Sequence, residues 1–524
     1  MGTEVRADVA VVGAGVVGLA AAHELLARGH TVAVIGPRPG RSPWPASAAS
    51  GAMLSMFSEL DTGQPEQRTA LEVGYRCQAH QRYPNWLASI EAASGSPVDL
   101  VPGTWVVAAA AERATLDAIS TAARAAGHPA ELHTGTDVSG LAPDVPAAAA
   151  LWLASECSLD SAQLLGALGC AVGGHRSARW NEDGAMAVDT GAAEVRIRCG
   201  TGATVVCDQV VLAAGIGIPA LLPDQGAELG VPPLLAGRGV SLLLSTPIAV
   251  EHTVRTPNAA FACGTHLVPR AEGTVYLGAT NRLTVAPRPH PVASLDEIAV
   301  LVRDATTVLD GGLGVAGLYQ AQVGYRPYTL DHLPLIGPTA DPRILLATAT
   351  YRCGVLLAPL LAELLADEIT TPGMLAGHPY RAARPMSRPG IADLLTAAHV
   401  EGLVEHLRGP AGHLSAAAHR QLAAFFSVAL HGALATDTDS SGRTAMTHLF
   451  EQAPVVEVLP SLLALAERLE VRTCSPPSLA TAPAPIPSPQ ESPPQPESVA
   501  TGPTHSPGIA GSTSSASTPW TASR

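Results

Sequence analysis

Two groups of residues in this sequence have the types and spacing that chemistry requires. Near the N-terminus, Gly13-Ala14-Gly15-Val16-Val17-Gly18 has the G-x-G-x-x-G spacing of a dinucleotide-binding loop. Far along the chain, Arg326 and Arg352 stand in the segments 324–327 and 351–354. A guanidinium group binds a carboxylate through two parallel hydrogen bonds. The sequence therefore predicts a phosphate-binding loop and two candidate ligands for an anionic substrate.

The residues around the first group fit a strand, a turn and a helix. Val9 to Val12 is a short apolar run, typical of a buried parallel strand. Val16 to Arg28 predicts an amphipathic helix that ends at Gly29. Thr31 to Ile35 supplies the second strand of a βαβ unit. A glycine triplet recurs by chance, but this context makes it a specific sign of nucleotide binding.

Each glycine has a separate part in such a loop. Gly13 makes the tight turn, Gly15 lets the backbone approach a pyrophosphate, and Gly18 lets the helix pack closely on the strand. The phosphates then lie at the helix N-terminus. One expected group is missing, because Gly36 stands where an acid should bind the ribose hydroxyls. Arg38 either binds a 2′-phosphate or is an arginine of an exposed loop.

Composition narrows the class of protein. The 524 residues suffice for two or three domains, and 47% hydrophobic with 15% charged residues fits a globular enzyme. All 31 basic residues are arginine, which excludes a P-loop lysine and a lysine Schiff base. The net charge of −14 argues against sequence-independent binding of nucleic acid.

The sequence shows no sign of export, membrane insertion or a metal site. Residues 1–7 are polar and lead directly into the first strand, so we expect no signal peptide. The apolar runs are too short to cross a membrane. The eight cysteines form no C-x-x-C pair and have no metal-ligand spacing. We expect a cytoplasmic protein with reduced thiols.

Helices and strands alternate over the first 370 residues. A loop of small residues, Ala46 to Leu54, suits close approach of the backbone to a flat ligand. Ser294 and Glu297 predict a capping box at the start of a helix. We expect helices over 68–93, 159–171, 294–309 and 355–369, strands over 103–110, 205–214, 317–325 and 344–347, and a strand-rich region over 233–280.

The remainder of the chain differs in composition. We expect a linker over 371–390, a helical module over 391–472 and a disordered tail over 473–524, which is rich in Pro, Ser, Thr and Ala. Within the module, Asp437 to Gly442 has the oxygens and glycine that open a calcium-binding EF-hand loop, but His448 replaces the bidentate glutamate. We interpret it as a polar loop between helices, with calcium binding as the alternative.

With these residues established, the first 370 positions resemble the D-amino-acid oxidase superfamily of flavoproteins. The likeness is strongest to its glycine oxidase branch, which is associated with thiazole formation for thiamine. It rests on blocks that occur in order: Val11 to Leu19, Gly51 to Leu54, Val211 to Gly215, Leu267 to Arg270, Leu277 to Thr280, Tyr325 to Pro327 with Leu333 to Gly337, and Arg352 to Pro359.

The resemblance implies an α/β (α+β) fold in which a Rossmann-like FAD-binding domain is interleaved with an antiparallel-sheet substrate domain. The FAD-binding parts would cover about 1–80, 150–230 and 320–370, and the substrate parts about 81–149 and 231–319. The FAD should be noncovalent, since Gly324 occupies the position of the flavin-linked cysteine of covalent members.

The resemblance also implies which residues contact the cofactor. The helix that begins near Val355 would direct its N-terminus at the flavin, where its partial positive charge is favourable. The expected FAD-binding residues are Gly13, Ala14, Gly15, Val16, Val17, Gly18, Arg38, Ser50, Gly51, Met53, Ala214, Gly215, Gly354, Val355 and Leu356.

Four residues are expected at the substrate. By resemblance, Arg326 clamps the substrate carboxylate and Arg352 lines the same pocket. His266 replaces a pocket tyrosine of glycine oxidases, and Asn281 replaces a methionine. The alternative for both arginines is an ion pair with Asp331 or another acid that holds loops together.

The expected reaction is the removal of a hydride from the alpha carbon of a small amino acid or amine, with dioxygen as electron acceptor. The products would be an imine or oxo acid, ammonia and hydrogen peroxide. One alternative is a D-amino-acid dehydrogenase that passes electrons to a quinone or protein. Another is a flavin-binding scaffold without activity. The sequence leaves open whether the chain forms a homo-oligomer and whether the helical module binds a protein partner.

Overall fold

A computed structural model describes residues 4–384 of the protein, with gaps at 40, 42–45, 62–65, 110–111, 135–137, 139–148, 192, 223–225, 227, 233, 259–263, 271–272, 285–291 and 330–332. The chain divides into two units, Met1–Thr473 and Cys474–Arg524. The predicted helical module, the tail, the loop Asp437 to Gly442 and Asp331 all lie outside the described residues.

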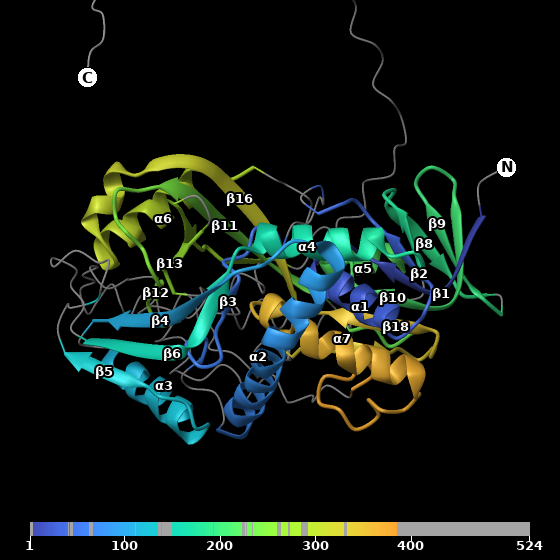
Figure 1. The fold of residues 1–524 in the computed structure, drawn as a ribbon, viewed down its shortest axis with the longest axis horizontal. Helices are drawn as coiled ribbons and strands as arrows, with labels where there is room; N and C mark the ends of the chain where they lie inside the picture. Colours follow the sequence, from blue (N-terminus) through green and yellow to red (C-terminus); the bar gives the residue numbers. More distant parts are fainter. Residues whose placement is uncertain are drawn as a thin grey trace, which may run out of the picture. The chain divides into compact units, whose positions relative to one another are not determined.

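Sheet A is the mainly parallel sheet that carries the nucleotide-binding motif. Its strand order is β17-β18-β10-β1-β2-β7, with β8 and β9 joined to β10 (Figure 1). The strands from β18 to β7 run parallel to one another. Their bounds are β1 Glu4–Val12, β2 Val32–Ile35, β7 Ala178–Asn181, β8 Ala185–Asp189, β9 Val195–Cys199, β10 Thr204–Leu212, β17 Leu335–Pro338 and β18 Ile344–Thr348.

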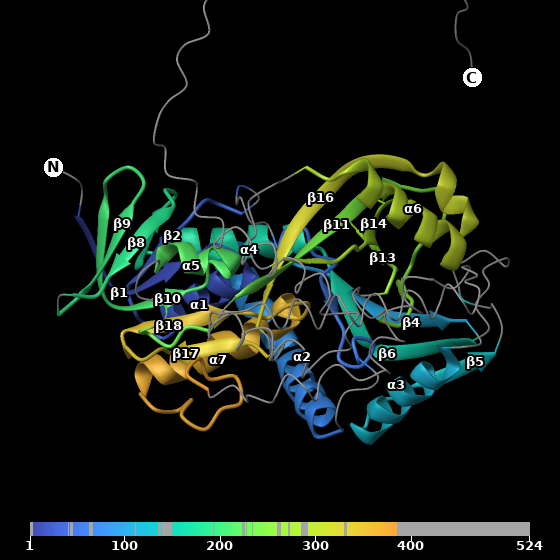
Figure 2. The same ribbon diagram turned by 180° about the vertical axis from the view of Figure 1, so that it is seen from behind.

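Both faces of sheet A are covered, which explains why its central strands are apolar throughout. Val9 and Val11 of β1 face a core shared with helices α1 (Val16–Ala27), α2 (Glu66–Ser94), α4 (Ser161–Gly174) and α7 (Gly354–Thr370). Ala10 and Val12 face the opposite core, which includes α5 (Ile218–Leu221) and the β8–β9 hairpin (Figure 2). The alternation of side chains along a strand thus divides one valine run between two cores.

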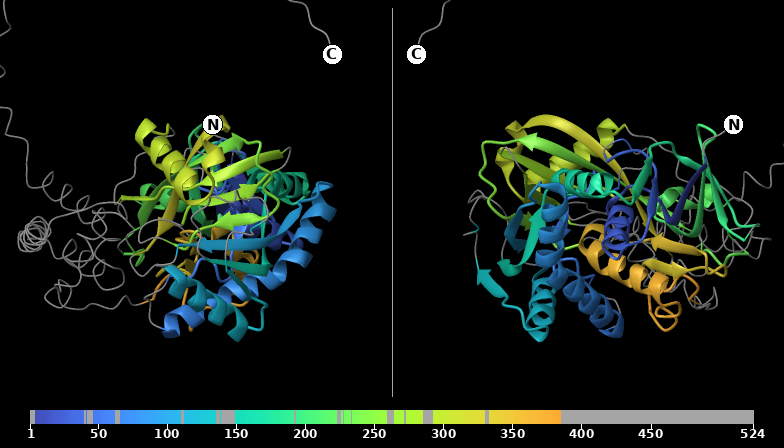
Figure 3. Two further views of the ribbon diagram at one scale, coloured as in Figure 1. Left: turned by 90° about the vertical axis from the view of Figure 1, so that its left-hand side faces the viewer. Right: turned by 45° about the vertical axis from the view of Figure 1, so that its right-hand side comes forward.

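Sheet B is mostly antiparallel and follows the order β15-β11-β14-β13-β12-β4-β6-β3, with β16 paired to β11 and β5 to β6. Helices α6 (Leu295–Val308) and α3 (Arg113–Ala125) pack at its two ends (Figure 3). The strand bounds are β3 Met53–Leu54, β4 Leu100–Ala108, β5 Glu131–Thr134, β6 Ala149–Leu159, β11 Leu235–Ser245, β12 Thr253–Arg255, β13 His266–Pro269, β14 Thr274–Gly278, β15 Arg282–Thr284 and β16 Gly317–Tyr328.

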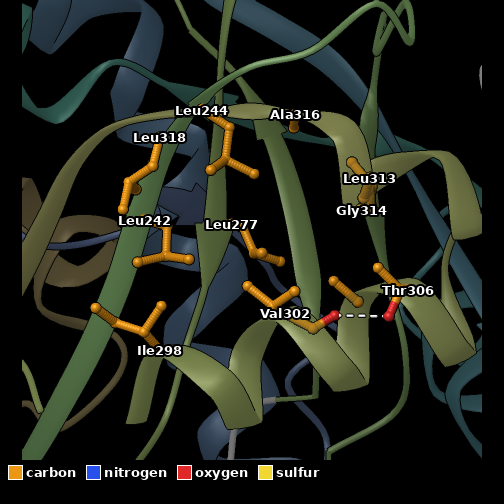
Figure 4. Close-up of a pocket in the computed structure, with 11 residues that line it drawn as sticks. Leu242, Leu244, Leu277, Ile298, Val302, Thr306, Leu313, Gly314, Ala316 and Leu318 are labelled. Atoms are coloured by element: carbon orange, nitrogen blue, oxygen red, sulfur yellow. Dashed lines mark hydrogen bonds between the residues drawn. The ribbon is translucent and has the colours of Figure 1, made fainter. Parts of the chain in front are cut away.

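An apolar pocket lies between α6 and sheet B (Figure 4). Leucine, isoleucine, valine, alanine and glycine line it, together with Thr306, whose hydroxyl donates to the carbonyl of Val302 at 2.8 Å. None of the described residues that line this pocket is titratable, so they offer no group for acid–base or ionic chemistry.

The predicted fold class is confirmed, and most elements occur where the sequence indicated them. The capping box of Ser294 and Glu297 forms at the start of α6. The helix predicted from Leu159 begins instead at Ser161, because Leu159 ends β6 and Asp160 caps the helix by accepting two backbone N–H bonds. Strand β6 and the β7–β9 strands were not predicted. In the described part of the chain, no helix is long and apolar enough to cross a membrane.

The division into cofactor-binding and substrate parts remains a prediction, but the sheets show where each strand belongs. β6, within residues 150–230, is a central strand of sheet B. β16 begins in sheet B and ends at Tyr328, shortly before β17 of sheet A. The chain therefore crosses between the two sheets at the ends of these long strands.

The close packing of α1 on β1 yields a prediction for stability. A Cβ atom at Gly18 would lie 2.0 Å from the carbonyl oxygen of Gly13, so Gly18→Ala must push the helix from the strand. We expect it to lower the free energy of unfolding by roughly 1–3 kcal/mol. Gly166 lies at an exposed position of α4 with no atom within 4 Å of an added Cβ, so Gly166→Ala should raise the free energy of unfolding by about 0.5–1 kcal/mol. Denaturant unfolding measures the free energy of unfolding of both variants. An equal change in the two would contradict the packing argument.

Candidate active site

The glycine loop between β1 and α1 has the geometry that a pyrophosphate needs. Gly13 has φ +114°, and a Cβ atom there would lie 2.5 Å from the carbonyl oxygen of Ala213. The Ala213 amide donates to the Val12 carbonyl at 2.8 Å, which joins this loop to the end of β10. The N-cap residue Gly15 has no side chain to cap α1, and of the first-turn amides Val16 donates to the Ser47 hydroxyl at 3.0 Å. The following amides of this turn are the groups that could receive an anion above the carboxyl edge of sheet A.

The loop of small residues, 46–54, is fastened to sheet B through its carbonyl groups. Arg270 donates to the carbonyls of Ser50 and Gly51, both at 3.0 Å. The Tyr276 hydroxyl donates to the Ala49 carbonyl at 3.0 Å. On the other side, the Ser47 hydroxyl accepts a bond from the Val16 amide of α1 at 3.0 Å. The loop thus joins the phosphate-binding helix to sheet B.

Helix α7 presents a second uncapped N-terminus. Cys353 is its N-cap residue and makes no side-chain cap bond. Gly354 opens the helix, and a Cβ atom there would lie 2.7 Å from the Thr350 hydroxyl oxygen. The Tyr83 hydroxyl donates to the Val355 carbonyl, which anchors this turn to α2. α7 also packs against α1, which follows the glycine loop, and against β3, which ends the loop 46–54.

Arg326 is held in place by neutral groups. Its Nη1 donates to the Thr280 carbonyl and to Asn281 Oδ1, both at 3.1 Å. Gly239 on β11 makes room for the guanidinium, since a Cβ atom there would lie 2.2 Å from Nη1. Among the described residues, no carboxylate pairs with Arg326. A half-buried guanidinium without a partner acid is suited to bind an anionic ligand.

Asn281 and Tyr351 complete the surroundings of Arg326. Asn281 Nδ2 donates to the Tyr351 hydroxyl at 2.6 Å. A Cβ atom at Gly237 would lie 2.5 Å from Asn281 Oδ1, so a second glycine of β11 leaves room for this pair. Tyr351 stands on the turn before α7, and its amide donates to the Pro327 carbonyl at 2.9 Å. Its φ is +46°, a conformation that non-glycine residues adopt mostly at constrained sites.

Arg352 has different partners from Arg326. Its Nη2 lies 2.8 Å from Asp61 Oδ2, and its Nε lies 3.4 Å from Glu59 Oε2. Glu59 also pairs with the fully buried Arg255 at 2.6 Å. Burial alone would raise the pKa of Glu59, but Arg255 and Arg352 outweigh it and hold the pKa far below its usual range. This network matches the loop-holding alternative for Arg352, and its role in the substrate pocket remains a prediction.

His266 is a buried and neutral imidazole. Its Nδ1 lies 2.8 Å from the Gly264 carbonyl oxygen, so this nitrogen must carry the proton. The ring stacks on Tyr276 with 5.7 Å between centroids. Added Cβ atoms at Gly51 and Gly278 would lie 3.1 and 2.6 Å from Nε2, which places this nitrogen beside the small-residue loop. Burial lowers the pKa of His266 to about 4, so Nε2 is a hydrogen-bond acceptor at neutral pH.

Arg38 lies at the edge of sheet A and forms a surface ion pair. Its Nε donates to Glu182 Oε1 at 2.9 Å, and its guanidinium lies 4.1 Å from the centroid of the Trp180 ring. With 42% of its side chain exposed, Arg38 fits the exposed-loop interpretation.

The structure thus brings Arg326, Asn281 and Tyr351 together and places His266 beside the loop 46–54. Sequence reasoning did not assign a role to Arg270, Tyr276, Glu59 or the two glycines of β11. The spacing of Gly237 and Gly239, two residues apart on one face of a strand, was an available signal. The contacts of Arg270 and Glu59 are with distant segments, so no local pattern indicates them.

Comparison with known proteins identifies the family of this chain. A family model described as "FAD dependent oxidoreductase" matches residues 8–368. Glycine oxidase from Geobacillus kaustophilus is 27% identical over 369 residues, which cover 69% of this chain and 92% of that protein. A bifunctional protein ThiO/ThiG from Trichormus variabilis is 26% identical over 389 residues, covering 69% of this chain and 52% of that protein.

Solved structures show the same fold. The crystal structure of the Geobacillus kaustophilus glycine oxidase has a TM-score of 0.63 and 25% identity, covering 73% of this chain and all of that one. An iminodiacetate oxidase from Chelativorans has a TM-score of 0.58 at 18% identity, covering 72% of this chain and 97% of that one.

The neutral state of His266 yields a prediction for the pH dependence of stability. An unfolded histidine titrates near pH 6.5, so between about 6.5 and 4 the unfolded chain binds a proton that the folded chain excludes. Stability should therefore fall as the pH drops through this window, and His266→Asn should reduce that slope. His133, with 45% of its side chain exposed, is the matched control. Unfolding followed at several pH values tests this, and an unchanged slope in His266→Asn would contradict the assignment.

Proposed function

The chain belongs to the DAO family of FAD-dependent oxidoreductases, and on that basis we propose that it oxidises a small amino acid or amine bearing a carboxylate. The observation that carries this proposal is Arg326, a half-buried guanidinium that is held by a carbonyl and an amide and, among the described residues, pairs with no acid. A substrate carboxylate would supply the missing counter-charge and form the bidentate contact that arginine favours.

FAD, when bound, supplies the acceptor for the two electrons removed from the substrate. The residues that would hold it fit its shape and charge. The open end of α1 and the glycines of its loop would receive the pyrophosphate. The loop 46–54 and the uncapped end of α7 would lie against the flavin. An added Cβ atom at Gly13 or Gly354 would meet atoms closer than 3 Å, so these turns leave no room for larger residues.

The substrate would be positioned by groups that do not themselves react. Arg326 would fix the carboxylate, and Asn281 and Tyr351 would fix the orientation of Arg326. Holding two reacting groups in one geometry removes much of the entropic cost of their encounter. The two described residues that hydrogen-bond to Arg326, Thr280 and Asn281, offer a carbonyl and an amide oxygen and no base for the alpha carbon.

His266 cannot take the role of the tyrosine that it replaces. A tyrosine there would donate a hydrogen bond to the carboxylate, whereas the Nδ1 proton of His266 is already bound to Gly264. The remaining nitrogen, Nε2, can only accept a bond at neutral pH. His266 therefore suits the substrate amine, with the carboxylate left to Arg326.

The relatives support a small substrate and a role for dioxygen. The glycine oxidase of Geobacillus kaustophilus is similar to this chain over most of its length, and the bifunctional ThiO/ThiG relatives suggest a link to thiamine formation. Oxidation of a primary amino acid, followed by hydrolysis of the imine, would give an oxo acid and ammonia, and dioxygen would be reduced to hydrogen peroxide.

The first experiment is anaerobic. The full chain is loaded with FAD, and the flavin absorbance is followed while glycine, sarcosine and a panel of D- and L-amino acids are added. Bleaching by an amino acid and return of colour in air would support the proposal. Flavin that no amino acid in the panel reduces would contradict it.

Replacing Arg326 should separate substrate binding from cofactor binding. We expect Arg326→Ala to lower kcat/KM by roughly 100-fold or more while FAD remains bound, because the substrate carboxylate would lose its counter-charge. Arg326→Lys should also lose much activity, since an ammonium cannot reproduce the planar fork. Arg303→Ala on α6, at a side chain 67% exposed, is the control. Wild-type turnover in Arg326→Ala would rule out the clamp.

Gly239 offers a test that leaves Arg326 in the chain. A Cβ atom at this position would displace the end of a flexible side chain, so Gly239→Ala should fold normally but move the guanidinium. We expect KM to rise at least severalfold with the FAD content unchanged. In Gly317→Ala, on the partner strand β16, the new Cβ atom would lie 3.9 Å from its nearest neighbours, so its kinetics should be unaffected. Equal kinetics in the two variants would show that Arg326 does not need its present position.

A further inference from the structure

We propose that Glu182, at the carboxyl end of β7, binds the ribose hydroxyls of the cofactor's adenosine and replaces the acid that is missing at position 36. The inference rests on membership of the FAD-dependent family and does not depend on which substrate is oxidised.

The backbone at position 36 explains why no acid stands there. Gly36 has φ +145°, a conformation that L side chains rarely adopt. Space is not the obstacle, because a Cβ atom would lie 3.5 Å from the nearest atom, the Ala14 nitrogen. The same contact places Gly36 against the phosphate-binding loop. The ribose of FAD, which is bonded directly to the pyrophosphate, would therefore come to this edge of sheet A.

Strand β7 brings Glu182 to the same edge. β7 runs parallel to β2, with Ile35 opposite Asn181, so both strands end together. The Gly36 amide donates to the Asn181 carbonyl at 2.9 Å, and Trp180 Nε1 donates to the Gly36 carbonyl at 3.0 Å. Glu182 is the next residue of this strand end. It can therefore offer its carboxylate beside Gly36 although it comes from a different part of the chain.

The carboxylate of Glu182 is oriented by arginines of the loop that follows β2. Arg38 Nε donates to Oε1 at 2.9 Å, and Arg41 Nη1 lies 3.8 Å from Oε2. Arg38 is itself fixed over the Trp180 ring, and a Cβ atom at Gly173 would lie 2.7 Å from its Nη1. A carboxylate has about four acceptor positions, so these contacts leave room for two ribose hydroxyls. Arg38 is thus a positioning residue rather than a reader of a 2′-phosphate.

The neighbouring acid provides a matched control. Asp183 carries the same charge one residue further on, but its carboxylate accepts a hydrogen bond from the Thr201 hydroxyl, and its amide donates to Asn181 Oδ1. Glu182→Gln and Asp183→Asn therefore make the same change in net charge at adjacent positions. Only the first alters the carboxylate that is paired with Arg38.

The test measures binding without turnover. The full chain is stripped of flavin and titrated with FAD, and ADP and 2′-deoxy-ADP are then compared as competitors. We expect Glu182→Gln to raise the Kd for FAD roughly tenfold, as for the loss of a hydrogen bond to a charged group, and Asp183→Asn to change it less than about twofold. The wild-type chain should prefer ADP over 2′-deoxy-ADP severalfold, and Glu182→Gln should lose this preference.

Two results would overturn the inference: an unchanged Kd for FAD in Glu182→Gln, or a preference for ADP that survives the substitution. The outcome is separate from that of the proposed function. A chain that binds FAD through Glu182 but is not reduced by any amino acid contradicts only the assignment of the substrate.

Discussion

The arrangement of the site depends on how the loop 46–54 is held between two sheets. Its carbonyls at Ala49, Ser50 and Gly51 accept bonds from Tyr276 and Arg270 of sheet B, while Ser47 accepts a bond from the first turn of α1. Burial lowers the pKa of Arg270, but its hydrogen bonds to carbonyl oxygens satisfy the guanidinium. Because backbone groups cannot be buried without partners, these bonds fix the loop although its own side chains are small. The small residues can then lie close to a flat ligand.

The arginines around this loop differ in whether an acid neutralises their charge. Arg255 and Arg352 are paired with Glu59 and Asp61, and such buried pairs are stable only while every member is present. Arg326 is bound by neutral acceptors, so its charge remains available for a ligand. In a chain whose cations are all arginine, the difference between a structural and a binding residue lies in the acids nearby and not in the residue type.

Glycines give the site its space. Gly237 and Gly239 of β11 make room for Asn281 and Arg326, and Gly51 and Gly278 make room for His266. At Gly36 the backbone conformation excludes a side chain, and the neighbouring strand offers an acid in its place. Glycines inside a strand and a missing acid after the second strand both depart from the usual sequence pattern, and both occur where a function is proposed.

The nucleotide-binding βαβ unit could be predicted from the sequence, because its glycines, apolar strand and helix are patterns of neighbouring residues. The capping box of α6 could be predicted for the same reason. The fold class followed from the alternation of elements and from blocks of resemblance. The sequence did not indicate β6, whose pattern of burial alternates only in part, or that Leu159 belongs to it rather than to α4.

Which arginine is paired with acids became visible only in the folded chain. Arg326 and Arg352 look alike in sequence, but the partners of Arg352 are some 290 positions away, and only folding brings them together. The same holds for Glu182, which directly follows Asn181, and Asn181 accepts a bond from the Gly36 amide because β7 pairs with β2. Hydrogen bonds and ion pairs act over a few ångströms of space, and local sequence patterns carry no record of contacts that the chain makes by folding back on itself.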